Sequence, residues 1–144
     1  MEIKIKKLSE NATLPRVATE FSAGADLCAC TDKDIEIGAG ETVLVHTGLA
    51  MEIPVGYAGM IFARSGLASK RGLAPANKVG VVDADYRGEV MVALHNHSAE
   101  TQVISHGERI AQLVVMPFLA ASFVEVETLE DTVRGAGGFG STGK

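Results

Sequence analysis

The sequence has few aromatic residues and no long hydrophobic run. It contains no tryptophan, and its 144 residues include only two tyrosines and five phenylalanines. No stretch approaches the roughly 20 consecutive apolar residues of a membrane-spanning helix, which excludes such a segment. The first ten residues contain no apolar run, so we expect no secretory signal. Aliphatic side chains must therefore fill the core, and self-association would help a domain of this size to bury apolar surface.

The sequence also lacks a basic excess and a cysteine framework. Lysine and arginine number 13 against 18 acidic residues, for a net charge of −5, which argues against a polymeric nucleic-acid partner. A small anionic ligand is still compatible with this charge, because local cations override the global sign. Cys28 and Cys30 lie two residues apart in a segment that favours a strand, so we expect two reduced thiols. Together with the missing secretory signal, they predict a cytoplasmic location.

Short apolar segments, separated by Gly, Pro, Asn and Asp, indicate an all-β domain. We expect at most one short helix, of about two turns near 67–71. Thr47-Gly48 predicts a hairpin turn between two strands, and residues 79–94 predict a second hairpin around the loop 83–88. The expected strands cover residues 3–5, 25–29, 35–37, 42–46, 49–53, 57–62, 79–82, 90–94, 102–104 and 110–116.

Two of these segments have unusual patterns. Residues 90–94 are apolar without alternation, which predicts a strand covered on both faces, with a second subunit as one cover. In the segment 110–116, period-two spacing places Gln112 on one face with Ile110, Val114 and Met116. An amide on such a face either hydrogen-bonds to the surrounding backbone or points at a ligand.

Four further features contain residue types suited to binding or catalysis. Arg64-Ser65-Gly66 precedes the helical candidate and suits either a phosphate or a plain surface turn. Asp83 and Asp85 are either a general base and its neighbour or turn residues. Tyr86 beside them either stacks on a flat ring or caps the core. Asp26 lies in an apolar run and needs a partner, either an arginine or a metal ion.

The C-terminal segment 134–143 contains five glycines, one arginine and one phenylalanine. Glycine-rich termini are usually disordered, but glycines also let backbone N–H groups close around an anion. A ligand-clamping arm and a disordered tail are both compatible with this pattern. We therefore divide the chain into a single all-β domain at 1–133 and a flexible arm at 134–144.

Five stretches, in this order, resemble the motifs of the trimeric deoxyuridine triphosphate nucleotidohydrolases, the dUTPases. They are AGADL at 23–27, ARSGLASKRG at 63–72, GVVDADYRG at 80–88, GERIAQL at 107–113 and RGAGGFGSTG at 134–143. The resemblance implies a jelly-roll-like β-clip domain that assembles as a homotrimer with shared active sites. It also implies the Mg²⁺-dependent hydrolysis of dUTP to dUMP and pyrophosphate, which limits uracil in DNA and supplies dUMP for thymidylate synthesis.

The resemblance also assigns roles to particular residues. Asp83 matches the general base that activates the water attacking the α-phosphorus, and Tyr86 matches the aromatic ring that stacks on the deoxyribose. The uracil-binding positions are matched by Asn77, Val81, Val82 and Met91. Family alignment selects Asp83 over Asp85 as the base.

The phosphate-binding positions are matched by Arg64, Ser65, Gly66 and Gln112. In the closing arm, the matching residues are Arg134, Phe139, Gly140, Ser141 and Thr142. Asp26 matches a carboxylate linked to the water shell of the metal or to neighbouring cations. Mg²⁺ would be carried largely by the triphosphate and completed by water, because it dehydrates reluctantly and needs few protein ligands.

Two other functions fit parts of the same pattern. A deoxycytidine triphosphate deaminase shares the implied fold, but such enzymes carry a catalytic glutamate and lack the glycine-rich arm. A catalytically inactive trimeric scaffold would not need the combination of Asp83 and the complete arm. Both features therefore favour the hydrolase.

Overall fold

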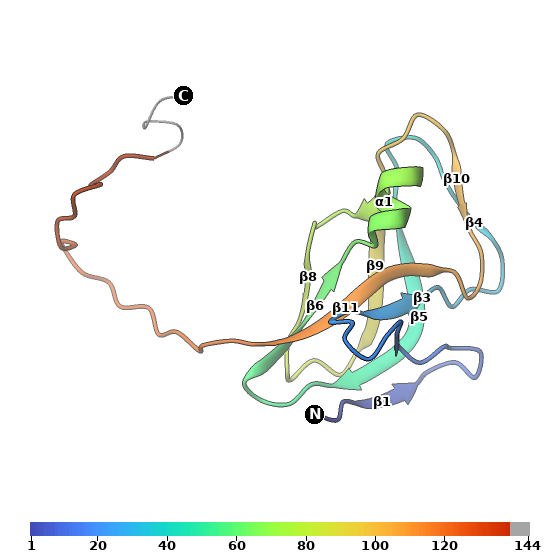
Figure 1. The fold of residues 1–144 in the computed structure, drawn as a ribbon, viewed down its shortest axis with the longest axis horizontal. Coiled ribbons are helices and arrows are strands. Elements are labelled where there is room, and N and C mark those ends of the chain that lie inside the picture. Colours follow the sequence, from blue (N-terminus) through green and yellow to red (C-terminus); the bar gives the residue numbers. More distant parts are fainter. Residues whose placement is uncertain (139–144) are drawn as a thin grey trace.

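Antiparallel strands form three sheets around one apolar core, and this computed structural model describes residues 1–138 (Figure 1). The four-stranded sheet has the order β1 (Lys4–Lys7), β5 (Thr42–Glu52), β9 (Glu89–Asn96), β7 (Leu73–Pro75). The five-stranded sheet has the order β2 (Arg16–Val17), β3 (Ala25–Cys28), β11 (Arg109–Pro117), β6 (Tyr57–Phe62), β8 (Gly80–Val82). The remaining pair is β4 (Ile35–Ile37) with β10 (Gln102–Ile104). This arrangement confirms the all-β prediction.

The only helix within residues 1–138 is α1 (Ser65–Arg71), which confirms the predicted helix and starts it slightly earlier. Arg64 is its N-terminal boundary with an extended backbone, and the helix ends at Gly72. Arg71 fixes its last turn by donating to Gln102 Oε1 at 3.0 Å and by pairing with Glu108. No helix in this part of the chain is long and apolar enough to cross a bilayer.

Aliphatic side chains fill the space between the two larger sheets. Leu27, Val45 and Leu94 of these sheets are fully buried, as is Ile37 of β4, and the partly buried Tyr57 packs against this core. No phenylalanine of the described residues belongs to this buried cluster, as the scarcity of aromatics predicts. The core therefore depends on many small aliphatic contacts, each of modest value.

One face of β9 enters the core, and the other is only half covered. Val90, Val92 and Leu94 are buried, whereas Met91 and Ala93 on the opposite face are partly exposed. We predicted that both faces of this strand are covered. The protomer itself covers one face of β9 and leaves the other partly exposed. The opposite face also carries Leu44 of β5, which is 50% exposed.

The hairpin predicted at Thr47-Gly48 is wrong, because β5 continues through both residues. The pairing of β5 with β9 shifts between His46↔Met91 and Ala50↔Glu89, so that residues 47–49 face a single residue of β9. Gly48 adopts a φ of 68° in this bulge, which an L residue rarely adopts. The turn-like sequence therefore encodes an irregularity within a long strand.

A second bulge changes the face predicted for Ile110. The register of β11 against β3 shifts between Arg109 and Ala111, and both Ile110 and Ala111 are buried in the core. Gln112, by contrast, is only partly buried and lies outside this core. The predicted common face of Ile110 and Gln112 is therefore wrong, because the extra residue interrupts the alternation.

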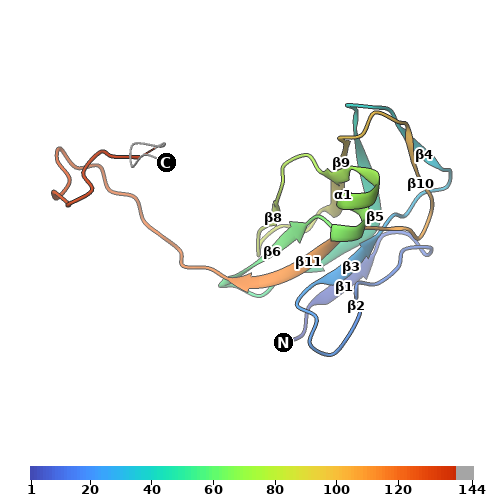
Figure 2. The same ribbon diagram turned by 45° about the horizontal axis from the view of Figure 1, so that its top comes forward.

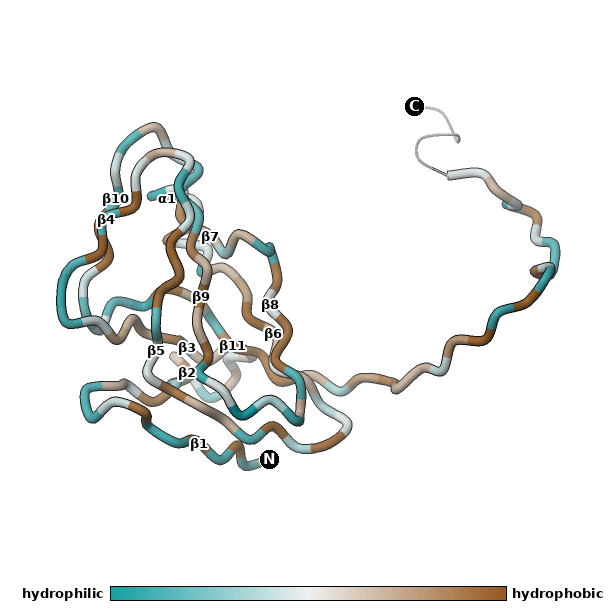
Figure 3. The backbone as a smooth tube through the Cα atoms, turned by 180° about the vertical axis from the view of Figure 1, so that it is seen from behind, coloured by the Kyte–Doolittle hydropathy of each residue, from teal (hydrophilic) through white to brown (hydrophobic). Residues whose placement is uncertain are grey.

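The chain leaves the domain after β11. Residues 118–138 form no helix or strand and run away from the sheets (Figures 1 and 2). Hydrophobic stretches alternate with hydrophilic ones along this segment (Figure 3). Leu119, Phe123 and Leu129 are each at least 86% exposed. The predicted division at 133/134 stays a prediction.

The two cysteines are both free thiols, as predicted. Cys28 is buried on β3, and Cys30 is partly exposed. Burial raises the pKa of the Cys28 thiol, and the nearby charge of Asp26 raises it further. Cys28 therefore remains a protonated, unreactive core residue near neutral pH.

Asn96 provides a test of the polar part of this core. Its side chain is fully buried and donates to the carbonyls of Ile37 and Glu100 at 2.9 and 2.7 Å. It also accepts from the Ser98 N–H at 2.9 Å. We expect Asn96→Ala to lower the free energy of unfolding by about 2–3 kcal/mol, because buried partners lose their hydrogen bonds.

Urea unfolding followed by circular dichroism measures this change. Asn11→Ala, at an exposed position, is the control and should change the stability by less than about 0.5 kcal/mol. Equal effects of the two substitutions would show that the Asn96 hydrogen bonds add nothing to stability.

Candidate active site

A cavity of about 250 Å³ lies between β8 and the first half of β9. Its lining includes the four residues matched to uracil binding, the ring matched to the deoxyribose and the predicted general base, namely Asn77, Val81, Val82, Met91, Tyr86 and Asp83. Leu44, Ile61, Gly80, Glu89 and Val90 complete the lining. The structure thus brings together six residues that are spread over 15 positions of the sequence.

The two strands beside this cavity do not pair with each other, so the hairpin predicted over 79–94 is wrong. Among residues 1–138, β8 pairs only with β6 in the five-stranded sheet, whereas β9 belongs to the four-stranded sheet. The loop 83–88 therefore crosses from one sheet to the other. Two facing strand edges of this kind can receive a flat polar ring and bind its edges with backbone groups.

β7 covers only part of one edge of β9. The pairing ends at Pro75↔Leu94, and the Ala76 N–H then donates to the Ala93 carbonyl at 2.8 Å. Among the described residues, no strand pairs with β9 beyond that point on this edge. The first half of β9 thus faces the cavity, while its other edge is held by β5.

The loop places the two aspartates differently. Asp83 lines the cavity, and its carbonyl accepts from the Tyr86 N–H at 3.2 Å in a tight turn. Asp85 does not line the cavity. Arg87 donates to the Ala84 carbonyl at 2.7 Å and so braces the turn. We expected a general base at this position to be partly buried. Asp83 is exposed in the protomer, so its own chain does not bury it.

A second cavity, of about 680 Å³, contains the other predicted cluster. Arg64, Ser65, Gly66, Gln112 and Asp26 all line it, together with Arg109. The carboxylate of Asp26 accepts from Arg64 Nε at 2.7 Å and from Arg109 Nη1 at 3.2 Å. The partner expected for Asp26 is therefore a pair of arginines. Two guanidinium groups against one carboxylate leave a local positive charge in an acidic chain.

Gln112 faces this cavity from β11. Its Nε2 donates to the Ala63 carbonyl at 2.8 Å, so the backbone interaction considered for it is present. Its Oε1 lies only 2.4 Å from where a Cβ at position 24 would be, so a larger residue there would displace the Gln112 amide from its present position. Sequence reasoning missed Gly24, although it lies within the AGADL stretch.

The remaining predicted residues belong to the C-terminal segment. Arg134 lies in the extended stretch, where its Nε donates to the Gly137 carbonyl at 2.8 Å. It lines neither cavity. Phe139, Gly140, Ser141 and Thr142 lie outside the described residues. Within one protomer, the nucleoside cavity and the arginine cavity have no lining residue in common.

Protein ligands for a metal ion are sparse at both cavities. Within residues 1–138, no group of three or more His, Cys, Asp or Glu side chains could hold a metal. The carboxylate of Asp26 is already engaged by two arginines. This donor set suits an ion such as Mg²⁺ that keeps its water and arrives with a phosphate ligand, and it suits Zn²⁺ poorly.

Leu44 and Arg109 line the cavities without having been assigned to them. Arg109 has a local signal, because it follows Glu108 in the GERIAQL stretch and was a candidate partner for Asp26. Leu44 has none: it is brought to the nucleoside cavity by the pairing of β5 with β9.

Comparison with known proteins identifies the family. The dUTPase family model matches residues 10–143. Deoxyuridine 5'-triphosphate nucleotidohydrolases from Nautilia profundicola and Acinetobacter baumannii are 51% and 48% identical, and each alignment covers the whole of this chain and at least 99% of the relative.

Solved structures agree in fold. The dUTPase of Staphylococcus bacteriophage 80alpha with dUpNHpp has a TM-score of 0.85 at 29% identity, with 99% of both chains covered. A mutant dUTPase from phage phi11 of S. aureus, described with a structural Mg(II) ion, has a TM-score of 0.81 at 25% identity, with 91% of this chain and 100% of that chain covered. On these matches and the two cavities above, the chain belongs to the dUTPase family of enzymes.

Proposed function

We propose that this chain hydrolyses dUTP to dUMP and pyrophosphate, which limits uracil in DNA and supplies dUMP for thymidylate synthesis. The observation that carries the proposal is the convergence of Asn77, Val81, Val82, Asp83, Tyr86 and Met91 on one cavity of nucleoside size. The relatives that are about half identical over the full chain are named for this activity.

The nucleobase enters between the unpaired edges of β8 and β9. Backbone N–H and C=O groups along these edges bind the polar edge of uracil as a pairing base would. Val81, Val82 and Met91 line the cavity, and in this proposal they crowd the position that a methyl group at uracil C5 would take. Thymine is excluded on this account by steric overlap, and cytosine by its reversed donor and acceptor pattern.

Asp83 acts as the general base. Its carboxylate accepts a proton from a water molecule, whose oxygen attacks the α-phosphorus while the bond to the bridging oxygen of pyrophosphate breaks. Arg64, Ser65 and Gln112 bind the phosphate oxygens and offset the charge that develops on them. Position and electrostatics thus supply most of the rate enhancement, with a single proton transfer.

The nucleotide binds as its magnesium complex. Bound Mg²⁺ neutralises phosphate charge and aligns the chain of phosphates for in-line attack. Asp26 would hold the water shell of the ion, while its ion pairs keep Arg64 and Arg109 in place. The sparse protein donors near the cavities agree with an ion held mainly by substrate and water.

The active enzyme is a homotrimer in which each site combines parts of several chains. Three observations support this assembly. The two cavities of one protomer have no common lining residue. The outer face of β9 is incompletely covered. The extended segment presents Leu119, Phe123 and Leu129 to solvent, which a neighbouring protomer can bury.

The segment 134–144 closes over a bound nucleotide. Arg134, Ser141 and Thr142 hold the γ-phosphate, and Phe139 covers the base, with Gly140 allowing close approach of the backbone. Closure excludes water other than the attacking molecule.

The proposed activity determines which products form from which nucleotide. With Mg²⁺, the purified protein should convert dUTP to dUMP and pyrophosphate and leave dCTP, dTTP and UTP essentially unchanged, because the cavity fits uracil and deoxyribose. Ion-exchange chromatography of the products measures this. Ammonia release from dCTP would replace the proposal with a deaminase, and binding without turnover of any nucleotide would replace it with an inactive scaffold.

Asp83→Asn should lower kcat about 10²–10⁴-fold, because an amide cannot accept the proton, while nucleotide affinity stays within a few-fold. Single-turnover kinetics and equilibrium titration with a non-hydrolysable analogue measure the two quantities. Asp85→Asn is the matched control and should retain its rate. Loss of rate in Asp85→Asn alone would reverse the assignment.

Deletion of residues 134–144 should lower kcat/KM for dUTP at least about 100-fold, because the γ-phosphate loses its cover. The fold and the trimer should persist, since no strand of the domain is removed. Light scattering after size exclusion, together with circular dichroism, checks this. A monomeric product would contradict the role given to the arm and assign these residues to assembly.

A further inference from the structure

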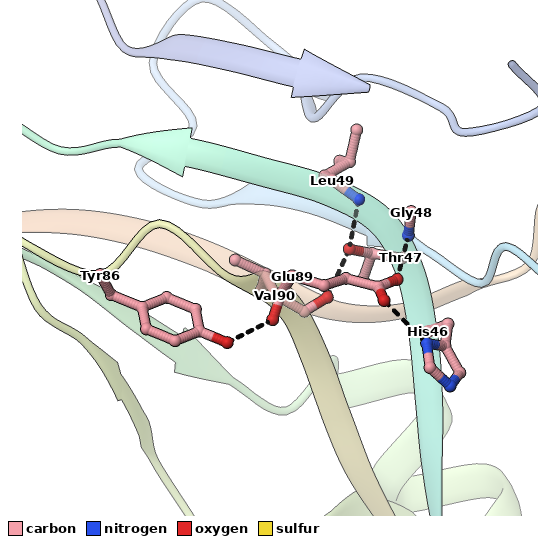
Figure 4. A network of polar contacts seen from close by, with 7 residues as sticks. All are labelled: His46, Thr47, Gly48, Leu49, Tyr86, Glu89 and Val90. Atoms are coloured by element: carbon pink, nitrogen blue, oxygen red, sulfur yellow. Dashed lines mark hydrogen bonds and ion pairs between the residues drawn. The ribbon is translucent and has the colours of Figure 1, made fainter. Parts of the chain in front are cut away.

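The ring of Tyr86 is held by its own loop and by β9. Its hydroxyl donates to the Glu89 carbonyl at 2.8 Å (Figure 4). The ring also packs on Gly88, since a Cβ there would lie 2.4 Å from the Tyr86 hydroxyl oxygen and 2.6 Å from Cζ. The ring position in the nucleoside cavity thus depends on where the backbone of Glu89 lies.

The side chain of Glu89 anchors that backbone to β5. One carboxylate oxygen accepts from the Gly48 N–H at 2.8 Å, and the other lies 2.9 Å from His46 Nδ1 (Figure 4). A hydrogen bond to an ionised group is among the stronger ones in proteins. Glu89 therefore fixes the start of β9 through both its main chain and its carboxylate.

The β5 bulge explains why a carboxylate is needed there. On the β9 side, residues 47–49 face only Val90, so the Gly48 N–H does not belong to the regular ladder between the two strands. On the other side, β1 pairs with Leu49, and the Gly48 carbonyl accepts from the Leu8 N–H at 2.8 Å. Thr47 Oγ1 donates to the Val90 carbonyl at 2.5 Å, and Glu89 supplies the acceptor for Gly48. Removing the carboxylate leaves the part-buried Gly48 N–H without this partner and loosens the junction.

Glu89 also forms a wall between two cavities. It lines the nucleoside cavity, and it lines a neighbouring cavity of about 380 Å³ together with Cys30, His46 and Gly48. Its side chain is 22% exposed, so it is largely shielded from water on both sides. No role for Glu89, His46 or Gly48 follows from the sequence motifs.

We infer that Glu89, held by Gly48 and His46, is the positioning residue for Tyr86, and that it thereby sets the discrimination between deoxyribonucleotides and ribonucleotides. The inference rests on the proposed function, with Tyr86 as the ring that stacks on the deoxyribose, because a ring in that place would also crowd the 2′-hydroxyl of a ribose. A ring that is free to move admits the ribose, whereas a fixed ring excludes it.

The kinetic test compares kcat and KM for dUTP and UTP in Glu89→Ala. We expect the ratio of the two kcat/KM values to fall about tenfold, the worth of one such hydrogen bond, mainly through better use of UTP. Glu89→Gln keeps an acceptor for the Gly48 N–H and should recover most of the ratio. His46→Gln should give an intermediate value.

The matched control is Glu41→Ala. The Glu41 carboxylate accepts from the Gly38 N–H at 2.8 Å, which is the same type of bond, and it lines neither the nucleoside cavity nor the arginine cavity. In Glu41→Ala, the ratio of kcat/KM for dUTP to that for UTP should equal the ratio of the unchanged protein. An unchanged ratio in Glu89→Ala, or an equal fall in Glu41→Ala, would overturn the inference.

A second readout needs no turnover. Because the chain has no tryptophan and only two tyrosines, Tyr57→Phe leaves Tyr86 as the sole source of tyrosine fluorescence. In that background, Glu89→Ala should lower the fluorescence anisotropy of Tyr86 and increase its quenching by acrylamide. Unchanged fluorescence would overturn the positioning role even if activity fell, whereas a change in a protein that fails to hydrolyse dUTP would support it and reject only the proposed function.

Gly88→Ala is the independent variant if Glu89→Ala unfolds. It displaces the ring by steric overlap and leaves the carboxylate in place. We expect the same fall in the ratio and the same rise in quenching. A Gly88→Ala protein with normal discrimination would mean that the ring position does not govern the choice of sugar.

Discussion

The partial pairing of β9 is the constraint on which the candidate site depends. β5 holds one edge along most of the strand, whereas β7 holds only the end of the other edge. The core anchors β9 through Val90, Val92 and Leu94. The strand is thus rigid, yet it keeps a length of unpaired backbone beside the nucleoside cavity. Without the early end of β7 at Pro75, there would be no free backbone for a base to meet.

The charge around Asp26 is opposite in sign to the net charge of the chain. The chain is acidic overall, but Arg64 and Arg109 converge on Asp26 and leave a net positive cluster. The carboxylate of Asp26 holds two guanidinium groups in fixed positions, and it neutralises one of their two positive charges. Such preorganisation lets the site receive a highly charged ligand with little rearrangement, because side chains that are already ordered lose little entropy on binding.

The sequence predicted elements well where one local signal dominated. β6 occupies the predicted residues 57–62, and the helix at 65–71 includes the predicted 67–71. Prediction from the sequence was wrong where the pairing of strands decides the local structure. Thr47-Gly48 has the composition of a turn, but β9 supplies Thr47 and Gly48 with partners inside a continuous strand. Period-two spacing places Ile110 on the same face as Gln112, but a bulge in β11 turns Ile110 into the core. Likewise, the sequence motifs identified most of the polar residues that line the two cavities. Leu44 belongs to no motif and reaches the nucleoside cavity only because β5 pairs with β9.

The apolar segment that follows β11 has a consequence for the lifetime of the chain in a cell. Until it is covered, it offers Leu119, Phe123 and Leu129 on an extended backbone, which is the form that proteases and chaperones recognise. The folded domain does not protect this stretch. In the proposed trimer, a newly made protomer is therefore most vulnerable before it assembles, so the rate at which it finds partners would help to determine how much of it survives.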